Sequence, residues 1–308
     1  MSVDQLEETL ATLDWADAMS DRPDRSDLSF RRKKDDEQFP IAFELGFHDG
    51  EIQIPQGVIQ GHTLDLILRD LTMHTAFVDD FDDLPIPFRA IASDIVRGEA
   101  YVMGDGDLAL AIRASMSVPG AFAPVRRDGR LLVDGGLVGN LGVNVVQNMD
   151  VDVIIAVDVE FPLYTMEELD SAVAISEQML TLLIRKETLR QIENLGPRDI
   201  LIRPDLGTFA STNFKGVTET IEPGAEATRA VADQLAVVAI DAAAYQSYSA
   251  QRIGVDVPQD NLAFVRLVHD VKVAPEILTG RMDVHAGDPI DPDLLAREAD
   301  RLFGLQLF

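Results

Sequence analysis

The sequence predicts an α/β protein whose central, mostly parallel sheet is covered by helices on both faces. Strand patterns alternate with helical patterns along the chain, and this alternation is typical of a parallel sheet between two helical layers. The strand patterns are short apolar runs, such as Val153-Ile-Ile-Ala-Val-Asp158, which favour strands buried on both faces. The longest helical patterns, over residues 167–192 and 222–248, are long enough to cover such a sheet.

The individual elements follow from local signals. Ser2 and Gln5 form a capping-box pattern, and Leu6, Leu10 and Leu13 follow at helical spacing, so the chain opens on a helix. The other expected elements are a hairpin over 39–54, a helix over 57–73, strands over 87–95 and 99–103, a helix over 108–116, a hairpin over 126–130 that leads into a strand at 131–134, a helix over 143–148, strands over 153–158 and 199–203, and the two long helices.

The pattern changes near residue 251. Residues 261–268 alternate as a strand, residues 274–278 begin a short helix, and residues 291–303 form a helix that ends at Gly304. The sequence therefore predicts a main domain over 1–250, a linker over 251–260 and a separate segment over 261–308.

Composition excludes several classes of function. The chain has 308 residues, 46% of them hydrophobic, which is ample for a large core. A formal net charge of −27 argues against a nucleic-acid partner and against electrostatic docking on anionic lipid. The absence of cysteine excludes thiolate chemistry. We expect neither a transmembrane helix nor a signal peptide within these residues.

The stretch from residue 110 to residue 158 contains the main candidate site. The apolar strand Leu131-Leu132-Val133 ends on Asp134, which is followed by Gly135 and Gly136. Two glycines allow positive φ angles and close backbone approach, so the chain can turn sharply there. Ligands of open α/β sheets collect at the carboxyl ends of strands, where an aspartate can accept a proton from a neighbour. The alternative is that Asp134 is only a turn residue, since Asp-Gly is a strong hairpin signal.

The residues around this turn carry a family resemblance. Residues 113–122 (RASMSVPGAF), the hairpin at 126–130 and Val133-Asp134-Gly135-Gly136 resemble the carboxyl-side half of the patatin-like phospholipase domain. The similarity extends from about Ser2 to about Tyr248. It implies a three-layer α/β/α fold, Asp134 as the base of a Ser-Asp dyad, and hydrolysis of a phospholipid or related ester through an acyl-serine. It implies no metal and no organic cofactor.

The chain departs from the family pattern at the nucleophile. The family's serine lies in G-x-S-x-G and its oxyanion loop in a glycine-rich run, both preceding the helix that residues 2–14 match. Neither motif occurs in this sequence, so we expect a patatin-like domain that is incomplete at its N-terminus and carries the base without its nucleophile. Two further hypotheses stay open: an inactive remnant of the lipid site or truncated gene product, and a module that binds a protein partner. If the missing strand belongs at the centre of the sheet, the chain should expose an apolar edge.

Residues 261–308 resemble the first half of a POTRA domain, with the order strand, helix, helix. POTRA domains follow some bacterial patatin-like domains and precede an outer-membrane barrel. The resemblance therefore suggests a bacterial, exported protein that associates with the outer membrane through a further extension. A POTRA sheet needs two more strands. The alternative is an amphipathic tail that packs on the main domain.

Other residues have structural interpretations that we favour. Asp94, after Ser93 at a strand end, matches a structural aspartate of the family, and Ser115 and Ser117 lack the nucleophile motif. The basic residues 31–34 are either a phosphate contact or a self-paired loop among acids. Residues 104–107 (GDGD) indicate a turn and lack the later ligands of a calcium loop. The polar loop at 208–216 is consistent with the rim of the site. The five histidines show no metal-ligand spacing.

Overall fold

The computed structural model describes residues 3–19, 46–48, 51–53, 59–160, 162–207, 209, 214–251, 261–267, 274–280 and 282–303. The strands are β1 (Gly46–His48), β2 (Glu51–Gln53), β3 (Ala90–Asp94), β4 (Glu99–Met103), β5 (Val125–Arg127), β6 (Arg130–Asp134), β7 (Ile155–Val157) and β8 (Ile200–Ile202). The helices of the first half are α1 (Val3–Thr12), α2 (Trp15–Ala18), α4 (His62–Thr72), η1 (Met73–Thr75), α5 (Leu108–Ser115), α6 (Gly136–Gly139) and α7 (Val143–Gln147). Those of the second half are α8 (Ala172–Ile192), η2 (Phe214–Thr220), α9 (Ile221–Ala230), α10 (Ala232–Val238), α11 (Ala242–Gln251), α12 (Pro275–Thr279) and α13 (Pro292–Phe303).

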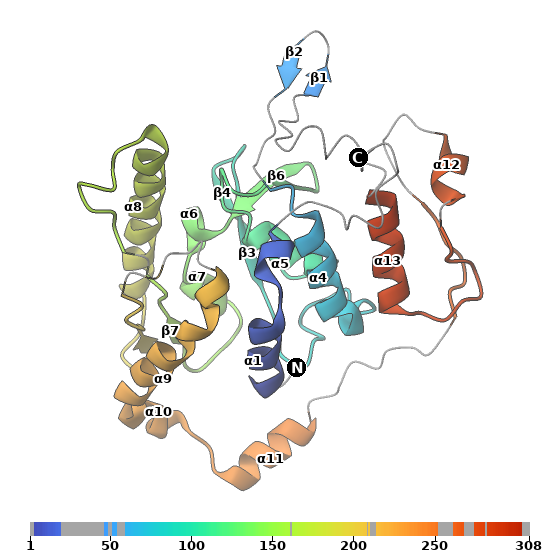
Figure 1. The fold of residues 1–308 in the computed structure, drawn as a ribbon. Helices are drawn as coiled ribbons and strands as arrows, with labels where there is room; N and C mark the ends of the chain where they lie inside the picture. The colour runs from blue at the N-terminus through green and yellow to red at the C-terminus, as the bar shows by residue number, and fades with distance from the viewer. Residues whose placement is uncertain are drawn as a thin grey trace.

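The α/β class is confirmed, and the larger sheet has the strand order β4-β3-β6-β5. Helices lie on both of its faces (Figure 1). On one face, Ala90, Ala92 and Leu132 pack against Ala111 and Ala114 of α5. On the other face, α6 packs on β3 and α8 packs on α6. Because side chains alternate along a strand, β3 contributes to both layers, which gives this part of the molecule its three-layer arrangement.

The expectation of a mostly parallel sheet is wrong for the described strands. All three pairings in the larger sheet, β3 with β4, β3 with β6 and β5 with β6, are antiparallel. The reason is that short turns join its strands: residues 95–98 connect β3 to β4, and Asp128 and Gly129 connect β5 to β6 with φ angles of 51° and 68°. Two successive residues with positive φ match the twist of an antiparallel hairpin, and parallel strands need a far longer crossover.

A second, two-stranded sheet pairs β7 with β8 in parallel. The crossover between them contains the long helix α8, as expected for a βαβ unit. One face of this pair packs on the short helix α7, where Val143 contacts Ile154 and Ala156. A further hairpin, β1 with β2, confirms part of the hairpin predicted over 39–54.

Most other predicted elements of residues 1–250 are confirmed, and the main differences are in the helices. The helix α8 begins at Ala172, five residues later than predicted, because the Ser171 hydroxyl accepts the N–H of Ala174 and caps the helix. The helix predicted over 222–248 is three helices. Val231 leaves helical geometry, and Asp241 caps α11 by accepting the N–H of Ala244. The short helices α2, α6 and η2 were not predicted.

The carboxyl-terminal segment keeps its two predicted helices as α12 and α13. The strand predicted over 261–268 is wrong for the described residues 261–267, where Asn261 makes an isolated bridge to Pro289. Instead of pairing in a sheet, Leu262 donates its N–H to the carbonyl of Asp288, and its own carbonyl accepts the N–H of Gly287. The helix α13 packs against α4 of the main domain (Figure 1). The POTRA resemblance and the domain boundaries stay predictions. Among the described helices, none is long and apolar enough to cross a membrane.

Candidate active site

Asp134 lies at the end of β6, where two segments hold its backbone: β3, and the carboxyl end of α5 with the loop that follows it. Its N–H donates to the carbonyl of Ser117 at 2.9 Å, and its carbonyl accepts the hydroxyl of Ser93 at 2.7 Å. The next N–H, that of Gly135, donates to the carbonyl of Ser115 at 3.3 Å. Contacts from β3 on one side and from the loop after α5 on the other therefore fix the position of the aspartate.

The Asp134 carboxylate is half-buried, and Oδ1 accepts the N–H of Gly136 at 2.7 Å. Burial raises the pKa of this carboxyl above its ordinary value, and the Gly136 N–H opposes the rise only in part. Within the described residues, no cation and no hydroxyl hydrogen-bonds to the carboxylate. A carboxylate that lacks a counter-ion and has a raised pKa is a better proton acceptor than a solvated aspartate.

Both glycines after Asp134 are required by close packing. A Cβ atom on Gly135 would lie 2.2 Å from the carbonyl oxygen of Ile91, and one on Gly136 would lie 2.8 Å from Oδ1 of Asp134. The positive φ angle expected from the sequence is wrong for Gly135, whose φ is −70°. The turn is right-handed because it opens directly into α6, and glycine is needed for space alone.

A buried arginine supports the loop that holds Asp134. Arg113 of α5 donates from Nη1 to the hydroxyl of Ser117 at 2.7 Å and from Nη2 to the carbonyl of Gln60 at 2.9 Å. Its guanidinium also lies 4.8 Å from the ring centroid of Phe122. The Ser117 hydroxyl donates back to the Arg113 carbonyl at 2.7 Å. The structural role predicted for Ser117 is therefore confirmed. The Ser117 carbonyl in turn accepts the N–H of Asp134.

Arg113 was not predicted from the sequence as a member of this site. The signal available was an arginine on the helix of residues 108–116 that an all-apolar core would not contain. A guanidinium is rarely buried unless several acceptors surround it, and only the fold shows which acceptors those are.

The helix α8 packs against α6, which follows the Asp134 turn. Thr188 and Gln191 are buried on the side of α8 that faces α6, where the Asn140 amide donates to the Thr188 hydroxyl and Gln191 accepts the N–H of Val143. Ile184, one turn earlier, lies near Gly136. Polar contacts therefore fix α6 and α7, which follow the Asp134 turn, against α8.

Asp94 is structural, as predicted. Its carboxylate is completely buried and accepts the N–H groups of Val96 and Arg97 as well as the guanidinium groups of Arg97 and Arg130. Burial opposes ionisation, yet these hydrogen bonds outweigh it and lower the Asp94 pKa to about 2. This is the opposite electrostatic environment to that of Asp134.

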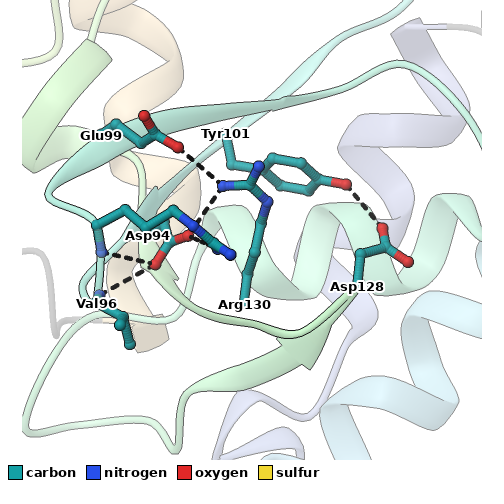
Figure 2. Close-up of polar contacts among 7 residues, drawn as sticks. Asp94, Val96, Glu99, Tyr101, Asp128 and Arg130 are labelled. Carbon is teal, nitrogen blue, oxygen red and sulfur yellow. Dashed lines mark hydrogen bonds and ion pairs between the residues drawn. The ribbon is translucent and has the colours of Figure 1, made fainter.

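Figure 2 shows how Arg130 extends the cluster around Asp94. The guanidinium lies between the carboxylates of Asp94 and Glu99, at 2.9 and 3.0 Å, and its Cζ is 4.6 Å from the ring centroid of Tyr101. The Tyr101 hydroxyl donates to Asp128 at 2.8 Å. These contacts tie the β3–β4 hairpin to the β5–β6 hairpin, and so they fix the strand that ends on Asp134.

Three further segments were candidates in the sequence: the turn at 104–107, the basic residues 31–34 and the polar loop at 208–216. The turn at 104–107 is confirmed as structural, because Asp107 caps α5 and Asp105 pairs with Arg127. The basic residues 31–34 and most of the loop at 208–216 lie outside the described residues. In the part of the chain that the structure describes, no group of three or more histidine, aspartate or glutamate side chains is arranged to hold a metal ion.

Comparison with known proteins finds a family match in the first part of the chain. Residues 1–146 match the family model described as patatin-like phospholipase. The match includes β6, Asp134 and both glycines, together with the loop at Ser115 and Ser117. The wider similarity expected as far as Tyr248 stays a prediction.

Individual relatives support the same class. An NTE family protein of Mycobacterium tuberculosis is 36% identical over 101 residues, which cover 33% of this chain and 27% of that protein. A second NTE family protein of that species is 27% identical over 203 residues, or 59% of this chain and 34% of the relative. The mouse patatin-like phospholipase domain-containing protein 7 is 42% identical over 80 residues, or 25% of this chain and 6% of that protein. The chain spans about a third or less of the length of these relatives.

Proposed function

We propose that this chain forms the carboxylate side of a patatin-like lipid ester hydrolase site, with Asp134 as the general base. The observation that carries the proposal is the environment of Asp134. Three backbone contacts fix the residue at a strand end, while its carboxylate has a raised pKa and one N–H donor within the described residues. The patatin-like match over residues 1–146 supports a lipid or ester as the substrate.

The chemistry follows from a carboxylate of this kind next to a serine hydroxyl. The serine oxygen forms a bond to the ester carbonyl carbon while its proton passes to Asp134. When the carbon–oxygen bond to the alcohol breaks, Asp134 returns that proton to the leaving alkoxide, and an acyl-serine remains. Water then attacks the acyl group by the same proton transfers, which releases the acid and restores the serine.

The serine of this scheme is not identified in the chain. The sequence has no G-x-S-x-G, and Ser93 and Ser117 hold their hydroxyl protons in hydrogen bonds to main-chain carbonyls. The proposal therefore assigns the nucleophile to a polypeptide segment that these 308 residues do not contain. Asp134 is the part of the dyad that this chain supplies.

Ester hydrolysis by the native protein, purified from its source cells, tests the proposal. We expect wild-type protein to hydrolyse a short-chain p-nitrophenyl ester and Asp134→Asn to lower the rate about a thousandfold or more. Asp83→Asn, at an exposed aspartate away from the site, is the matched control and should keep the wild-type rate. Equal activity in Asp134→Asn would remove Asp134 from the mechanism.

Because the sequence lacks the nucleophile motif, the second candidate function is non-enzymatic. If the native protein hydrolyses no ester, the domain is either a partner-binding module or a remnant of the site. Affinity capture from the source cell separates these two outcomes, because a module retains one partner saturably and a remnant retains none.

A further inference from the structure

The turn that carries Asp134 has a second side-chain oxygen close to the carboxylate. Asn140 is the residue that caps the carboxyl end of α6. From the position that a Cβ atom on Gly136 would occupy, Oδ1 of Asp134 lies at 2.8 Å and Oδ1 of Asn140 lies at 3.4 Å. Both oxygens therefore lie on the same side of Gly136, close to a common point.

The hydrogen bonds of Thr188 decide which end of the Asn140 amide faces Asp134. The Thr188 hydroxyl donates its proton to the carbonyl of Ile184 at 3.0 Å, so its oxygen can only accept from Asn140. The part of Asn140 that contacts it, also at 3.0 Å, is therefore the NH2 group. This arrangement leaves the amide oxygen on the side of Gly136. Because Thr188 is buried on α8, its hydroxyl holds the amide in this orientation.

The third group near this point is apolar. Cδ1 of Ile184 lies 3.3 Å from the same Cβ position on Gly136. A carboxylate oxygen, an amide oxygen and a methyl group therefore lie together beside the turn. Two acceptors suit a small molecule that has two O–H groups to donate, and the methyl group offers no donor to the lone pairs of that molecule. A water molecule has this chemistry, because it can donate one proton to each oxygen and keep its lone pairs for another partner.

We propose that Asn140, together with Asp134, holds the water molecule that hydrolyses the acyl-serine, a role that rests on the proposed function. The water oxygen forms a bond to the acyl carbon while one of its protons passes to the Asp134 carboxylate. The other proton stays in the hydrogen bond to Oδ1 of Asn140. When the bond between the acyl carbon and the serine oxygen breaks, Asp134 returns the first proton to that oxygen, and the acid is released.

Asn140 therefore acts in the second half of the reaction only. In the first half, the attacking serine hydroxyl has a single proton, which passes to Asp134, and no second proton needs an acceptor. Water is the reactant that brings two protons. Loss of the Asn140 oxygen should slow the release of the acyl group roughly tenfold, the effect of one hydrogen bond, and leave its transfer to serine unchanged.

The partition of the acyl-serine between water and methanol tests this role in native protein purified from its source cells. Methanol has one O–H proton, so it needs Asp134 but not Asn140. In Asn140→Leu, the ratio of methyl ester to free acid formed from a p-nitrophenyl ester at a fixed methanol concentration should rise roughly tenfold. Asn148→Leu, at the exposed asparagine that caps α7, is the matched control and should keep the wild-type ratio. An unchanged ratio in Asn140→Leu overturns the proposal.

The hydroxyl that orients the amide gives a second test. Thr188→Val removes this hydroxyl and should raise the ratio of methyl ester to acid, whereas Thr188→Ser retains it and should keep the ratio near the wild-type value. A rise in both variants, or in neither, contradicts the orienting role. This pair also decides the matter if thermal melting shows that Asn140→Leu folds poorly.

Asp134→Asn separates a failure of this role from a failure of the proposed function. If the wild type hydrolyses the ester and Asp134→Asn does not, the general base stands, and the product ratios alone decide the role of Asn140. If the wild type hydrolyses no ester, the proposed function fails, and the role of Asn140 fails with it.

Discussion

Gly135 is the residue on which the geometry of the Asp134 turn depends most sharply. Gly135→Ala would place a methyl group 2.2 Å from the Ile91 carbonyl oxygen, so either β3 or the turn must move. We expect a loss of about 2 kcal/mol or more in the free energy of unfolding, measured by urea denaturation.

The matched control for this change is Gly224→Ala in α9. Gly224 is helical and has no atom within 4 Å of its Cβ position, so alanine should stabilise the protein by about 0.5–1 kcal/mol. Replacing glycine by alanine should therefore lower the free energy of unfolding at position 135 and raise it at position 224. A loss at Gly224 equal to that at Gly135 would contradict the packing argument.

At the residue scale, the sequence predicts Asp134, Gly135 and Gly136 as a unit, because the strand pattern ends on them and the family motif contains them. The sequence also indicates structural roles for Asp94 and Ser117, which their hydrogen bonds confirm. The buried environment of Asp134 could not be predicted, since it comes from segments that are distant in the chain.

Among the elements, α5 and its following loop support the site through Arg113. A lysine at position 113 lacks the guanidinium group that donates to the Ser117 hydroxyl and the Gln60 carbonyl at the same time. We therefore expect Arg113→Lys to lower the free energy of unfolding by about 2 kcal/mol. Exchange of the Asp134 amide should become faster in the same variant, because its acceptor is the Ser117 carbonyl. Arg126→Lys, at an exposed position of β5, is the control. Unchanged stability and exchange in Arg113→Lys would show that the arginine does not hold the loop.

The two hairpins of the larger sheet are clamped together by Asp94, which gives the fold an acid-sensitive contact. The Asp94 pKa is lowered to about 2 in the folded state. In the unfolded protein the pKa of an aspartate is near 4. Because the Asp94 pKa is lower in the folded protein, the ionised carboxylate stabilises the fold at pH values above about 4. This contribution is lost as the pH falls toward 2. We therefore expect Tm to fall between about pH 4 and pH 2.

Asp94→Asn tests this assignment by thermal melting followed by circular dichroism across the pH range. The variant should have a lower Tm at neutral pH, because Arg97 and Arg130 lose their charged partner. It should also show a smaller decrease between pH 4 and pH 2 than the wild type. A variant with the same acid response as the wild type would place the sensitive group elsewhere.

Element types were predictable where the local pattern and the final environment agree. The strands β3, β4, β6, β7 and β8 are such cases. The helix ends at Ser171 and Asp241 were missed because both are ordinary capping residues inside longer helical patterns. The strand predicted at 261–268 failed because alternation alone does not form a strand when no partner strand lies beside it.

For the whole molecule, the α/β class followed from alternating patterns, but the direction of the sheet did not. The hairpin signal at Asp128-Gly129 was visible in the sequence, whereas the antiparallel pairing of β3 with β6 depends on contacts across about 40 residues. The apolar edge expected if the missing strand belongs at the centre of the sheet stays a prediction. Among the described strands β7 pairs with β8 alone, and Ile155 and Val157 are each 49% exposed.

The titration of the Asp134 carboxyl in the 308-residue chain, followed by carbon-13 NMR, tests directly whether Asp134 has the environment of a general base. It reports on the base itself and needs no nucleophile. Because burial outweighs the Gly136 N–H, we expect a pKa above that of an ordinary aspartate. The folded state should then favour the protonated form, and the protein should lose stability as the pH rises through this pKa. A pKa at or below the ordinary value would argue against Asp134 as the base and identify it as a turn residue.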